Sequence, residues 1–380
     1  MSRKEYLEEN CDMYEIEFGD KSFNYYLYNK SPENCLQQLF AMDDVECFII
    51  ICDKNVGSLY GQKIAKQIQS HCKCELLMFE CTEKHKNLKV LEDLIERSLA
   101  LNANRRTCII GLGGGICGNM AGMIAALLFR GIRFVHIPTS LMAALDSVLS
   151  LKQAINSRLG KNLIGIFHTP EMVITSMDFF KTLPRGEVIS GMCEVIKNAL
   201  AILPDSIEQL SSLLRLECSY TQKDYRYFID MSIQAKTIVM KNDPFEKQDA
   251  LILEYGHTIG HAIELADPGK ISHGEAIGLG MLCAAEISHQ MGYLSERDVN
   301  LHRELLNRAG ASTRIAEHIQ PETILSIMKY DNKRGYIHSE NGAIHMVLLE
   351  SIGKPLKNNG KMLTVVPETV VKQAIIGMYK

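Results

Sequence analysis

The stretch TCIIGLGGGICGNMAG, residues 107–122, decides the fold because it runs from an apolar segment through a glycine-rich turn into a helix. Gly113, Gly115 and Gly118 follow the spacing G-x-G-x-x-G, which lets backbone N–H groups at a helix N-terminus approach a pyrophosphate. The same pattern also fits a tight turn with close helix packing at Gly122 and no ligand. Dinucleotide binding is therefore one of two interpretations of this segment.

Apolar and amphipathic segments alternate ahead of this turn. In chain order they are ECFIIICD (46–53), LYGQKIAKQIQ (59–69), CELLMFE (74–80), LKVLEDLIERSLALN (88–102) and TCIIGLGG (107–114). This order predicts a β-α-β-α-β unit whose parallel sheet is buried on both faces.

Both ends of the chain show other patterns. The segment YEIEFGDKSFNYYLY (14–28) predicts a hairpin that turns at residues 19–20. From about Leu183 onward, long apolar patterns with a helical period predict a mostly helical half. AIHMVLLESIGKP (343–355) and MLTVVP (362–367) predict short strands ahead of a terminal helix.

The expected fold class is α/β plus all-α. Residues 1–182 are predicted to form a Rossmann-like domain with a parallel sheet, and residues 183–380 a mainly helical domain. The pattern changes at Pro184 and Gly186, and 380 residues suffice for two domains. Because ligands often bind between domains, chemistry is expected where motifs of both halves converge.

Composition excludes several classes of function. With a formal net charge of −4, the chain lacks the basic character that binding to nucleic acid requires. It has no run of about 18 apolar residues and no apolar segment after its basic N-terminal residues, which predicts a cytoplasmic protein without a membrane partner. Its 12 cysteines are scattered through apolar segments, which favours buried reduced thiols. Cys72 and Cys74 alone lie close together, which is weak evidence for zinc.

Three histidines have a spacing typical of a metal site. LEYGHTIGHAIE (253–264) places His257 and His261 four residues apart, on one face of a helix. His273 lies in SHGE, at the start of the next predicted helix. Imidazoles suit Zn²⁺ or Co²⁺ and leave a coordination position open for a substrate oxygen. A lone histidine would more often simply pack in the core, but three favour a metal.

Two carboxylates are candidates to complete such a site. Glu194, in GMCEVIKN, is a charge within an apolar helical run, where burial is costly without a partner. Glu275, in the SHGE turn, is the rival. The residues alone leave both possibilities open.

Polar side chains follow the predicted strands of the first half. Asp53 closes the first apolar strand, with Asn55 beyond it, and a carboxylate there can accept hydrogen bonds from a ribose. Glu83 and Lys86 follow the next strand and would line the same edge of the sheet. An ordinary Rossmann unit instead places its acidic residue about 20 residues beyond the glycine-rich turn. Each of these residues alone also fits a solvated loop.

Several cations lie in motifs that contain glycine, asparagine or aspartate. Individually, such side chains can extend from an apolar surface to water. As a set they suit a polyhydroxylated phosphate ester. They are Lys152, Lys161, Lys197, Lys333, Arg334 and Lys354.

Seven motifs together resemble the dehydroquinate synthase-like sugar-phosphate cyclases in order and spacing. They are GLGGGICGNMAG, PTSLMAALDS, GKNLIG, TLPRGE, GMCEVIKN, GHTIGHAIE and HGEAIGLGM, and the match covers nearly the whole chain. The resemblance implies a Rossmann-like domain plus a helical domain, a homodimer, bound NAD and one catalytic divalent metal ion, Co²⁺ or Zn²⁺.

The resemblance also implies roles for individual residues. The implied metal ligands are Glu194, His257 and His273. The implied NAD contacts are Asp53, Asn55, Glu83, Lys86, Gly115, Asn119, Thr139, Ser140, Lys161 and Thr182. The implied substrate contacts are Arg130, Asp146, Lys152, Asn162, Lys197, His261 and Lys354, with Arg130 similar to a family arginine that reaches the substrate phosphate of the neighbouring subunit. Lys152, Lys197, His261 and Glu254 are the candidate catalytic residues.

Departures from dehydroquinate synthase narrow the expected substrate. That enzyme has an arginine seven residues before the first metal histidine and an asparagine three before it, where this chain has Ala250 and Glu254. Its GGK-T pattern is replaced here by LSLKQ (149–153). Losing the arginine removes a clamp for a substrate carboxylate, so a neutral sugar phosphate is favoured. DSVLSLKQAIN (146–156), FEKQDALILEYGHTIGH (245–261) and YDNKRGYI (330–337) resemble the branch that acts on glucose 6-phosphate.

The implied reaction converts glucose 6-phosphate to a deoxygenated inosose and phosphate, in aminoglycoside antibiotic biosynthesis. Its steps are transient C4 oxidation by NAD, phosphate elimination, re-reduction and aldol closure. Glu254 or the substrate's own phosphate would remove the C5 proton. The alternatives are 3-dehydroquinate synthase, a metal-dependent polyol dehydrogenase, and a catalytically inactive subunit of another enzyme.

Overall fold

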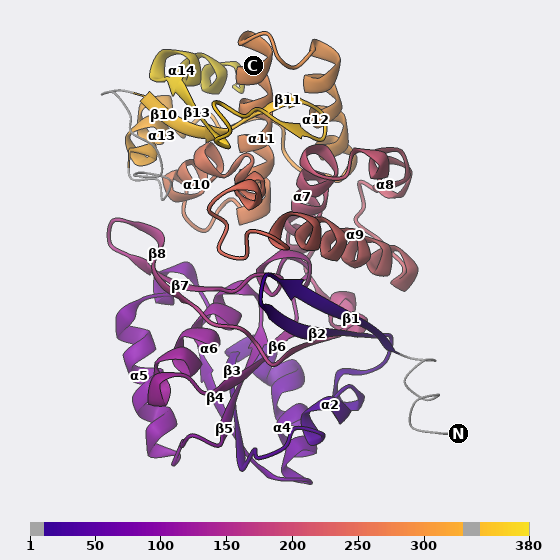
Figure 1. The fold of residues 1–380 in the computed structure, drawn as a ribbon, viewed down its shortest axis with the longest axis vertical. Helices are drawn as coiled ribbons and strands as arrows, with labels where there is room; N and C mark the ends of the chain where they lie inside the picture. Colours follow the sequence, from indigo (N-terminus) through magenta and orange to yellow (C-terminus); the bar gives the residue numbers. More distant parts are fainter. Residues whose placement is uncertain (1–10, 330–342, 380) are drawn as a thin grey trace. The chain divides into compact units, whose positions relative to one another are not determined.

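The computed structural model describes residues 11–329 and 343–379. It divides into two compact units, the first extending to Leu183 and the second beginning at Pro184 (Figure 1). The motif YDNKRGYI (330–337), which contains Lys333 and Arg334, lies outside the described residues.

The first unit is built on a seven-stranded sheet with the order β1-β2-β9-β6-β5-β3-β4. In that order the strands are Cys11–Phe18, Lys21–Tyr28, Met172–Ser176, Arg133–Pro138, Thr107–Gly113, Cys47–Asp53 and Lys73–Phe79. β1 and β2 pair antiparallel around a turn at Gly19 and Asp20, as predicted, and the other neighbours pair parallel. The central strands β3 and β5 are buried almost throughout because helices cover both faces of the sheet.

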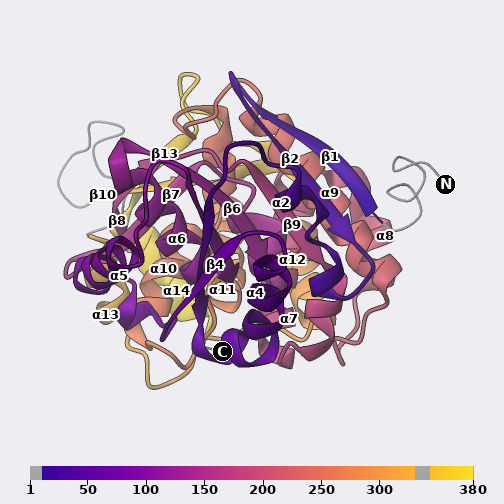
Figure 2. The ribbon, with the colours of Figure 1, turned by 90° about the horizontal axis from the view of Figure 1, so that it is seen from below.

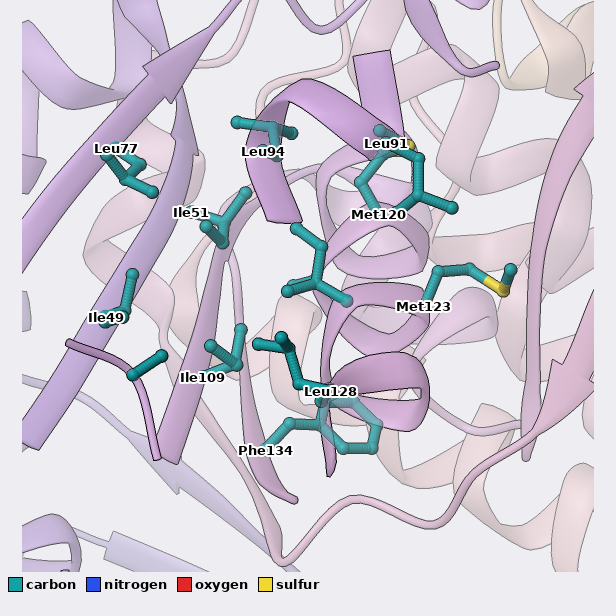
Figure 3. Packing of buried hydrophobic residues seen from close by; sticks show 14 of the residues in the cluster. Ile49, Ile51, Leu77, Leu91, Leu94, Ile109, Met120, Met123, Leu128 and Phe134 are labelled. Atoms are coloured by element: carbon teal, nitrogen blue, oxygen red, sulfur yellow. The ribbon is translucent and has the colours of Figure 1, made fainter. Parts of the chain in front are cut away.

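Helices α5 (Leu88–Ala100) and α6 (Gly115–Leu127) cover one face of the parallel strands (Figure 2). There Ile49, Ile109 and Phe134 of the strands share a buried apolar cluster with side chains of both helices (Figure 3). Helix α4 (Gln62–Gln69) and the turn before it lie on the opposite face, against the strand side chains that alternate with this cluster. The alternation of strand side chains therefore gives the unit a core on each side of the sheet.

A fully buried histidine lies between the sheet and α6. His136, on β6, is 2% exposed, and neither ring nitrogen has a hydrogen-bond partner among the residues that the structure describes. A Cβ atom at Gly118 would lie 3.1 Å from the His136 ring, so only glycine lets α6 approach this closely. Burial lowers the pKa of His136 to about 3, and the folded unit therefore holds the imidazole neutral.

We expect this histidine to make stability depend on acidity. In the unfolded chain His136 takes up a proton below pH 6.5, whereas in the folded chain it stays neutral down to about pH 3. Its stabilising contribution is thus complete above pH 6.5 and decreases by about 1.4 kcal/mol per pH unit below that. Urea unfolding at a series of pH values measures this slope. His136→Leu should show a shallower slope, and equal slopes for the two proteins would contradict the expectation.

A separate hairpin, not predicted from the sequence, extends from the first unit. β7 (Lys152–Ser157) and β8 (Gly160–Phe167) pair antiparallel as their own two-stranded sheet. The backbone N–H of Asn156 donates to the carbonyl of Lys86 at 2.8 Å, which fixes the hairpin beside the loop that follows β4. The hairpin therefore places two lysine-bearing motifs near that edge of the sheet.

The second unit is mainly helical, with short strands near its end. Its helices are α7 (Arg185–Ala201), α8 (Ile207–Leu213), α9 (Gln222–Met240), α10 (His257–Ala266), α11 (His273–Gln290), α12 (Glu296–Arg308), α13 (Pro321–Met328) and α14 (Glu368–Gly377). β10 (Ala343–Val347) pairs with β13 (Leu363–Pro367), and β11 (Leu349–Ser351) pairs with β12 (Lys354–Pro355). Capping boxes at Thr221 and Ser295 start α9 and α12.

Glycines allow the helices of the second unit to pack backbone against backbone. A Cβ atom at Gly280, on α11, would collide with the carbonyl oxygen of Gly256, and one at Gly274 would collide with that of Ser190 on α7. Gly256 itself has a φ of 82°, a conformation that only glycine adopts without strain. The start of α11 is therefore held tightly between α10 and α7.

These observations confirm the predicted fold class, a parallel-sheet α/β part followed by a mainly helical part. Among the described residues, no helix has the length and apolar character needed to cross a membrane. The twelve cysteines are all free thiols, nine of them buried, and Cys72 and Cys74 belong to no group of metal-binding side chains within the described ranges.

Candidate active site

Three histidines of the second unit meet where α10 lies against the start of α11. His257 and His261 lie one turn apart on α10, and His273 is the first residue of α11. One ring nitrogen from each lies within 4.8 Å of the others. The ring centroid of His257 is 5.1 Å from that of His261 and 5.7 Å from that of His273. The predicted pair and the predicted third histidine therefore form one cluster.

Glu194 faces this cluster from α7. Its side chain is completely buried, and Oε1 lies 3.9 Å from Nε2 of His257. The Lys197 ammonium forms an ion pair with Oε2, but without hydrogen-bond geometry, and neither carboxylate oxygen has a hydrogen-bond donor among the described residues. Lys197 compensates the charge beside Oε2, whereas Oε1, the oxygen that faces His257, is buried without a hydrogen-bond donor among the described residues, which is costly. The arrangement therefore fits a divalent ion beside Glu194.

Two of the histidines are held in a fixed orientation. Nδ1 of His257 lies 3.2 Å from the backbone oxygen of Tyr255, and Nδ1 of His273 lies 3.0 Å from Oε2 of Glu264. A proton on each Nδ1 leaves the Nε2 lone pair as the metal-binding atom. Burial, and next the Lys197 ammonium, hold the pKa of His257 well below its usual value, so this ring stays neutral. Neutral imidazole is the form that binds metal.

The rival carboxylate, Glu275, has a structural partner. Ser272 is the N-cap of α11, and its Oγ accepts a hydrogen bond from the Glu275 N–H at 3.3 Å. The same hydroxyl donates to Oε2 of Glu275 at 2.8 Å. Glu275 therefore completes a helix cap, whereas Glu194 faces the histidines.

The other predicted residues of the second unit lie around this cluster or apart from it. Glu254 ends the helical turn Asp249–Glu254 and acts electrostatically on His257. Lys197 is 1% exposed beside Glu194. Lys354, at the start of β12, instead forms an exposed ion pair of 2.9 Å with Glu350.

The glycine-rich turn links β5 to α6 in the first unit, and side chains of neighbouring segments pack closely against its glycines. A Cβ atom at Gly114 would lie 3.3 Å from Oγ of Ser140, and one at Gly115 would lie 3.3 Å from Oγ of Ser147. The N–H of Thr139 donates to the carbonyl of Gly113 at 2.9 Å. The predicted residues Gly115, Thr139 and Ser140 thus lie together around the N-terminus of α6, where an anion is favoured.

Asn119 and Asp53 use their side chains to hold backbone near this turn. The Asn119 amide donates to the carbonyl of Gly115 at 3.0 Å and accepts from the N–H of Ala154 at 2.9 Å. Asp53, at the end of β3, accepts from the N–H groups of Asn55 at 2.8 Å and Cys81 at 3.1 Å. Both residues therefore fix the carboxyl edge of the sheet.

A polar network connects the loop after β4 with the β7–β8 hairpin. Its predicted members are Glu83, Lys86, Lys161 and Asn162. Glu83 pairs with Lys161 at 3.0 Å and accepts from Asn156 at 2.6 Å. Lys86 donates to Oδ1 of Asn162 at 2.6 Å. Burial alone would raise the pKa of Glu83, but Lys161 and Lys86 outweigh it and lower that pKa. Asn156, to which the sequence analysis assigned no role, is a further member of this network.

The remaining predicted residues of the first unit lie on separate elements. Thr182 shares a hydrogen bond of 2.7 Å with the hydroxyl of Tyr60. Arg130 lies in the turn after α6 and has a positive φ of 70°. Asp146 lies in the helical turn Ala143–Ser147, and Lys152 is the first residue of β7. The predicted substrate contacts are thus divided between the units.

Relatives of known name match nearly the whole chain. The 2-deoxy-scyllo-inosose synthase of Micromonospora echinospora is 43% identical over 361 residues, 95% of this chain and 91% of the relative. That of Streptomyces kanamyceticus is 44% identical over 329 residues, 86% of this chain and 84% of the relative. A crystal structure of 2-deoxy-scyllo-inosose synthase complexed with carbaglucose-6-phosphate, NAD⁺ and Co²⁺ matches with a TM-score of 0.90 and 39% identity, over 96% of this chain and 99% of that one.

Family models give the same result at a broader level. The model of the N-terminal part of 3-dehydroquinate synthase matches residues 76–190, and that of its C-terminal part matches residues 191–334. The resemblance inferred from the seven motifs is confirmed. This chain belongs to the dehydroquinate synthase-like sugar-phosphate cyclases and, among them, to the 2-deoxy-scyllo-inosose synthase family.

Proposed function

We propose that this chain converts glucose 6-phosphate to 2-deoxy-scyllo-inosose and phosphate, as a carbon–oxygen lyase that uses NAD and one divalent metal ion. The observation that carries the proposal is the buried carboxylate of Glu194 facing the clustered imidazoles of His257 and His273. Family membership supports it, because a relative of 39% identity is complexed with carbaglucose-6-phosphate, NAD⁺ and Co²⁺.

The proposed metal ligands are Glu194, His257 and His273. Two imidazoles and one carboxylate suit Co²⁺ or Zn²⁺, and three protein ligands leave a position for a substrate oxygen. A bound ion of this kind supplies Lewis acidity to an alcohol oxygen, and bound NAD supplies a reversible hydride acceptor. His261 lies in the same histidine cluster and is proposed to contact the substrate.

The proposed NAD site comprises the glycine-rich turn and the polar network of the first unit. The N-terminus of α6 offers backbone N–H groups to a pyrophosphate, and Gly114 and Gly115 themselves add no side chain there. Asp53 and Thr182 are proposed to contact the nucleotide, as are the network residues Glu83, Lys86 and Lys161. Asn55, Asn119, Thr139 and Ser140 complete the proposed set.

Glu254 is the proposed base for removal of the C5 proton, and the substrate's own phosphate is the alternative. Oxidation at C4 acidifies the adjacent C–H, so a carboxylate can remove that proton as phosphate departs from C6. Four side chains are proposed to stabilise the charge of the departing phosphate, namely Lys152, Asn162, His261 and Lys354. Asp146 and Lys197 are the further proposed substrate contacts. Ala250 provides no cation to clamp a carboxylate, which favours a neutral sugar phosphate over a keto acid.

The backbone at Arg130 supports a role for its side chain. Phe129, Arg130 and Gly131 have φ values of 51°, 70° and 114°, and positive φ is costly at the first two. Such strain is typical of functional sites, where the surrounding structure must hold a side chain in place. Arg130 is proposed to reach the substrate phosphate of the partner subunit. This role of Arg130 requires a homodimer, which is part of the proposal. A cytoplasmic location and a role in aminoglycoside antibiotic biosynthesis are further parts of it.

The proposal predicts stoichiometric phosphate release from glucose 6-phosphate without net consumption of NAD. The purified protein would be incubated with Co²⁺ and catalytic NAD, and in parallel with the seven-carbon keto-acid phosphate used by 3-dehydroquinate synthase. Phosphate and product mass would be measured, together with the absorbance of NADH. Phosphate release from the keto-acid phosphate alone would identify a 3-dehydroquinate synthase. Accumulating NADH without phosphate would identify a polyol dehydrogenase.

A further inference from the structure

We propose that Glu264 is a positioning residue that orients His273 for the divalent ion. This inference rests on the proposed function, because it assumes that an ion binds at His273. Glu264 is the last residue of the motif GHTIGHAIE, whose two histidines belong to the proposed site.

Glu264 lies on the same face of α10 as the two histidines. His257, His261 and Glu264 follow one another at intervals of four and three residues, which stacks their side chains along one stripe of the helix. This stripe faces the start of α11, because Gly260 packs against the backbone of Ala276 there. Glu264 therefore extends the line of chemically active side chains by one more turn.

The carboxylate contacts His273 through the nitrogen remote from the proposed metal. Oε2 of Glu264 lies 3.0 Å from Nδ1 of His273, and the Glu264 side chain is only 10% exposed. An ionised carboxylate accepts hydrogen bonds and donates none, so the shared proton belongs to Nδ1 of His273. The Nε2 lone pair of His273 is then available to the ion, and the carboxylate makes the ring more electron-rich.

His273 needs such a contact more than His257 does. His257 is 10% exposed, and its Nδ1 is held by the backbone oxygen of Tyr255. His273 is 29% exposed and stands at the first position of α11, just after the N-cap Ser272. Less packing surrounds its ring, so a hydrogen bond must supply more of the orientation. Both rings therefore present Nε2 to the proposed ion. The backbone oxygen of Tyr255 orients His257, and Glu264 orients His273.

The chain offers a matched control at the end of the same helix. Asp267 follows α10 and lies 2.8 Å from Nε2 of His318, with the Asp267 side chain 11% exposed. This acid–histidine contact resembles that of Glu264 in distance and burial. His318 does not belong to the metal-binding group found among the described residues. Asp267→Asn thus weakens a similar contact without touching the proposed ligands.

The test starts from protein stripped of metal. Co²⁺ is then added, and both its affinity and the visible spectrum of the bound ion are measured. Glu264→Ala should bind Co²⁺ ~10–100-fold more weakly than the parent protein, with a changed d–d spectrum. Glu264→Gln retains an acceptor oxygen and should recover part of the affinity. Asp267→Asn should match the parent protein in both measurements. Thermal melting identifies any variant that does not fold. If Glu264→Ala does not fold, Glu264→Gln is compared with the parent protein instead.

Three results would overturn the inference. Parental affinity and spectrum in both Glu264 variants would show that the ion does not depend on this contact. An equal loss in Asp267→Asn would show a general effect of disturbing α10. Absence of Co²⁺ binding in the parent protein would instead remove the metal site itself, and the proposed function would fall together with this inference.

Discussion

Replacement of His257 by alanine is expected to abolish tight binding of the divalent ion and, with it, phosphate release from glucose 6-phosphate. His257 is buried, faces Glu194 and is kept neutral by its surroundings. Loss of the hydrogen-bond partner of a metal ligand typically lowers metal affinity by ~10–100-fold, and removal of the ligand itself should lower that affinity further. Metal content after dialysis and equilibrium binding of Co²⁺ measure the effect.

The matched control removes a histidine of the same unit that lies outside the cluster. His318 has a side chain that is 56% exposed, so His318→Ala should retain metal and activity. Melting curves of the two variants would separate loss of the ion from loss of the fold. One tightly bound ion per chain in His257→Ala would show that the ligand set is wrong.

Replacement of Glu254 by glutamine is expected to leave metal and NAD binding intact while slowing phosphate release by ~10²–10⁴-fold, the usual contribution of a general base. Glutamine has a similar size but cannot accept the C5 proton. Oxidation at C4 does not require this carboxylate, so reduced nicotinamide should accumulate on the enzyme during the first turnover, before phosphate is released. Stopped-flow absorbance and a phosphate assay on the same sample distinguish the two steps.

A second glutamate of the same unit serves as the reference. Glu286, on α11, accepts a hydrogen bond from Gln290, and Glu286→Gln should behave like the parent protein. Full phosphate release by Glu254→Gln would exclude Glu254 as the base. The phosphate of the substrate would then be the base that remains.

The sequence predicts the first unit well wherever one periodic pattern decides the structure. The apolar runs around Ile49 and Ile109 form central parallel strands, because Val, Ile and Phe side chains suit a sheet that is buried on both faces. The β7–β8 hairpin was not predicted. β8 shows no regular alternation of buried and exposed residues, and β7 alternates between half-buried and buried positions over only four residues. The position of the hairpin depends on contacts with the distant loop that contains Glu83 and Lys86.

The histidine cluster could be predicted in part from spacing. The interval between His257 and His261 sets both on one helix face, but the approach of His273 depends on glycine packing between α10 and α11. The choice between Glu194 and Glu275 needed the family resemblance. The structure adds a physical reason, because Ser272 engages Glu275 in a cap that local sequence already contains as S-x-x-E.

Anomalous diffraction from crystals grown with Co²⁺ tests the metal site most directly. A single strong peak is predicted about 2.0–2.2 Å from Nε2 of His257, Nε2 of His273 and a carboxylate oxygen of Glu194. Glu264 should remain hydrogen-bonded to Nδ1 of His273 in the same crystals. A peak coordinated by other side chains, or bound Co²⁺ that leaves Glu194 paired only with Lys197, would contradict the proposed centre.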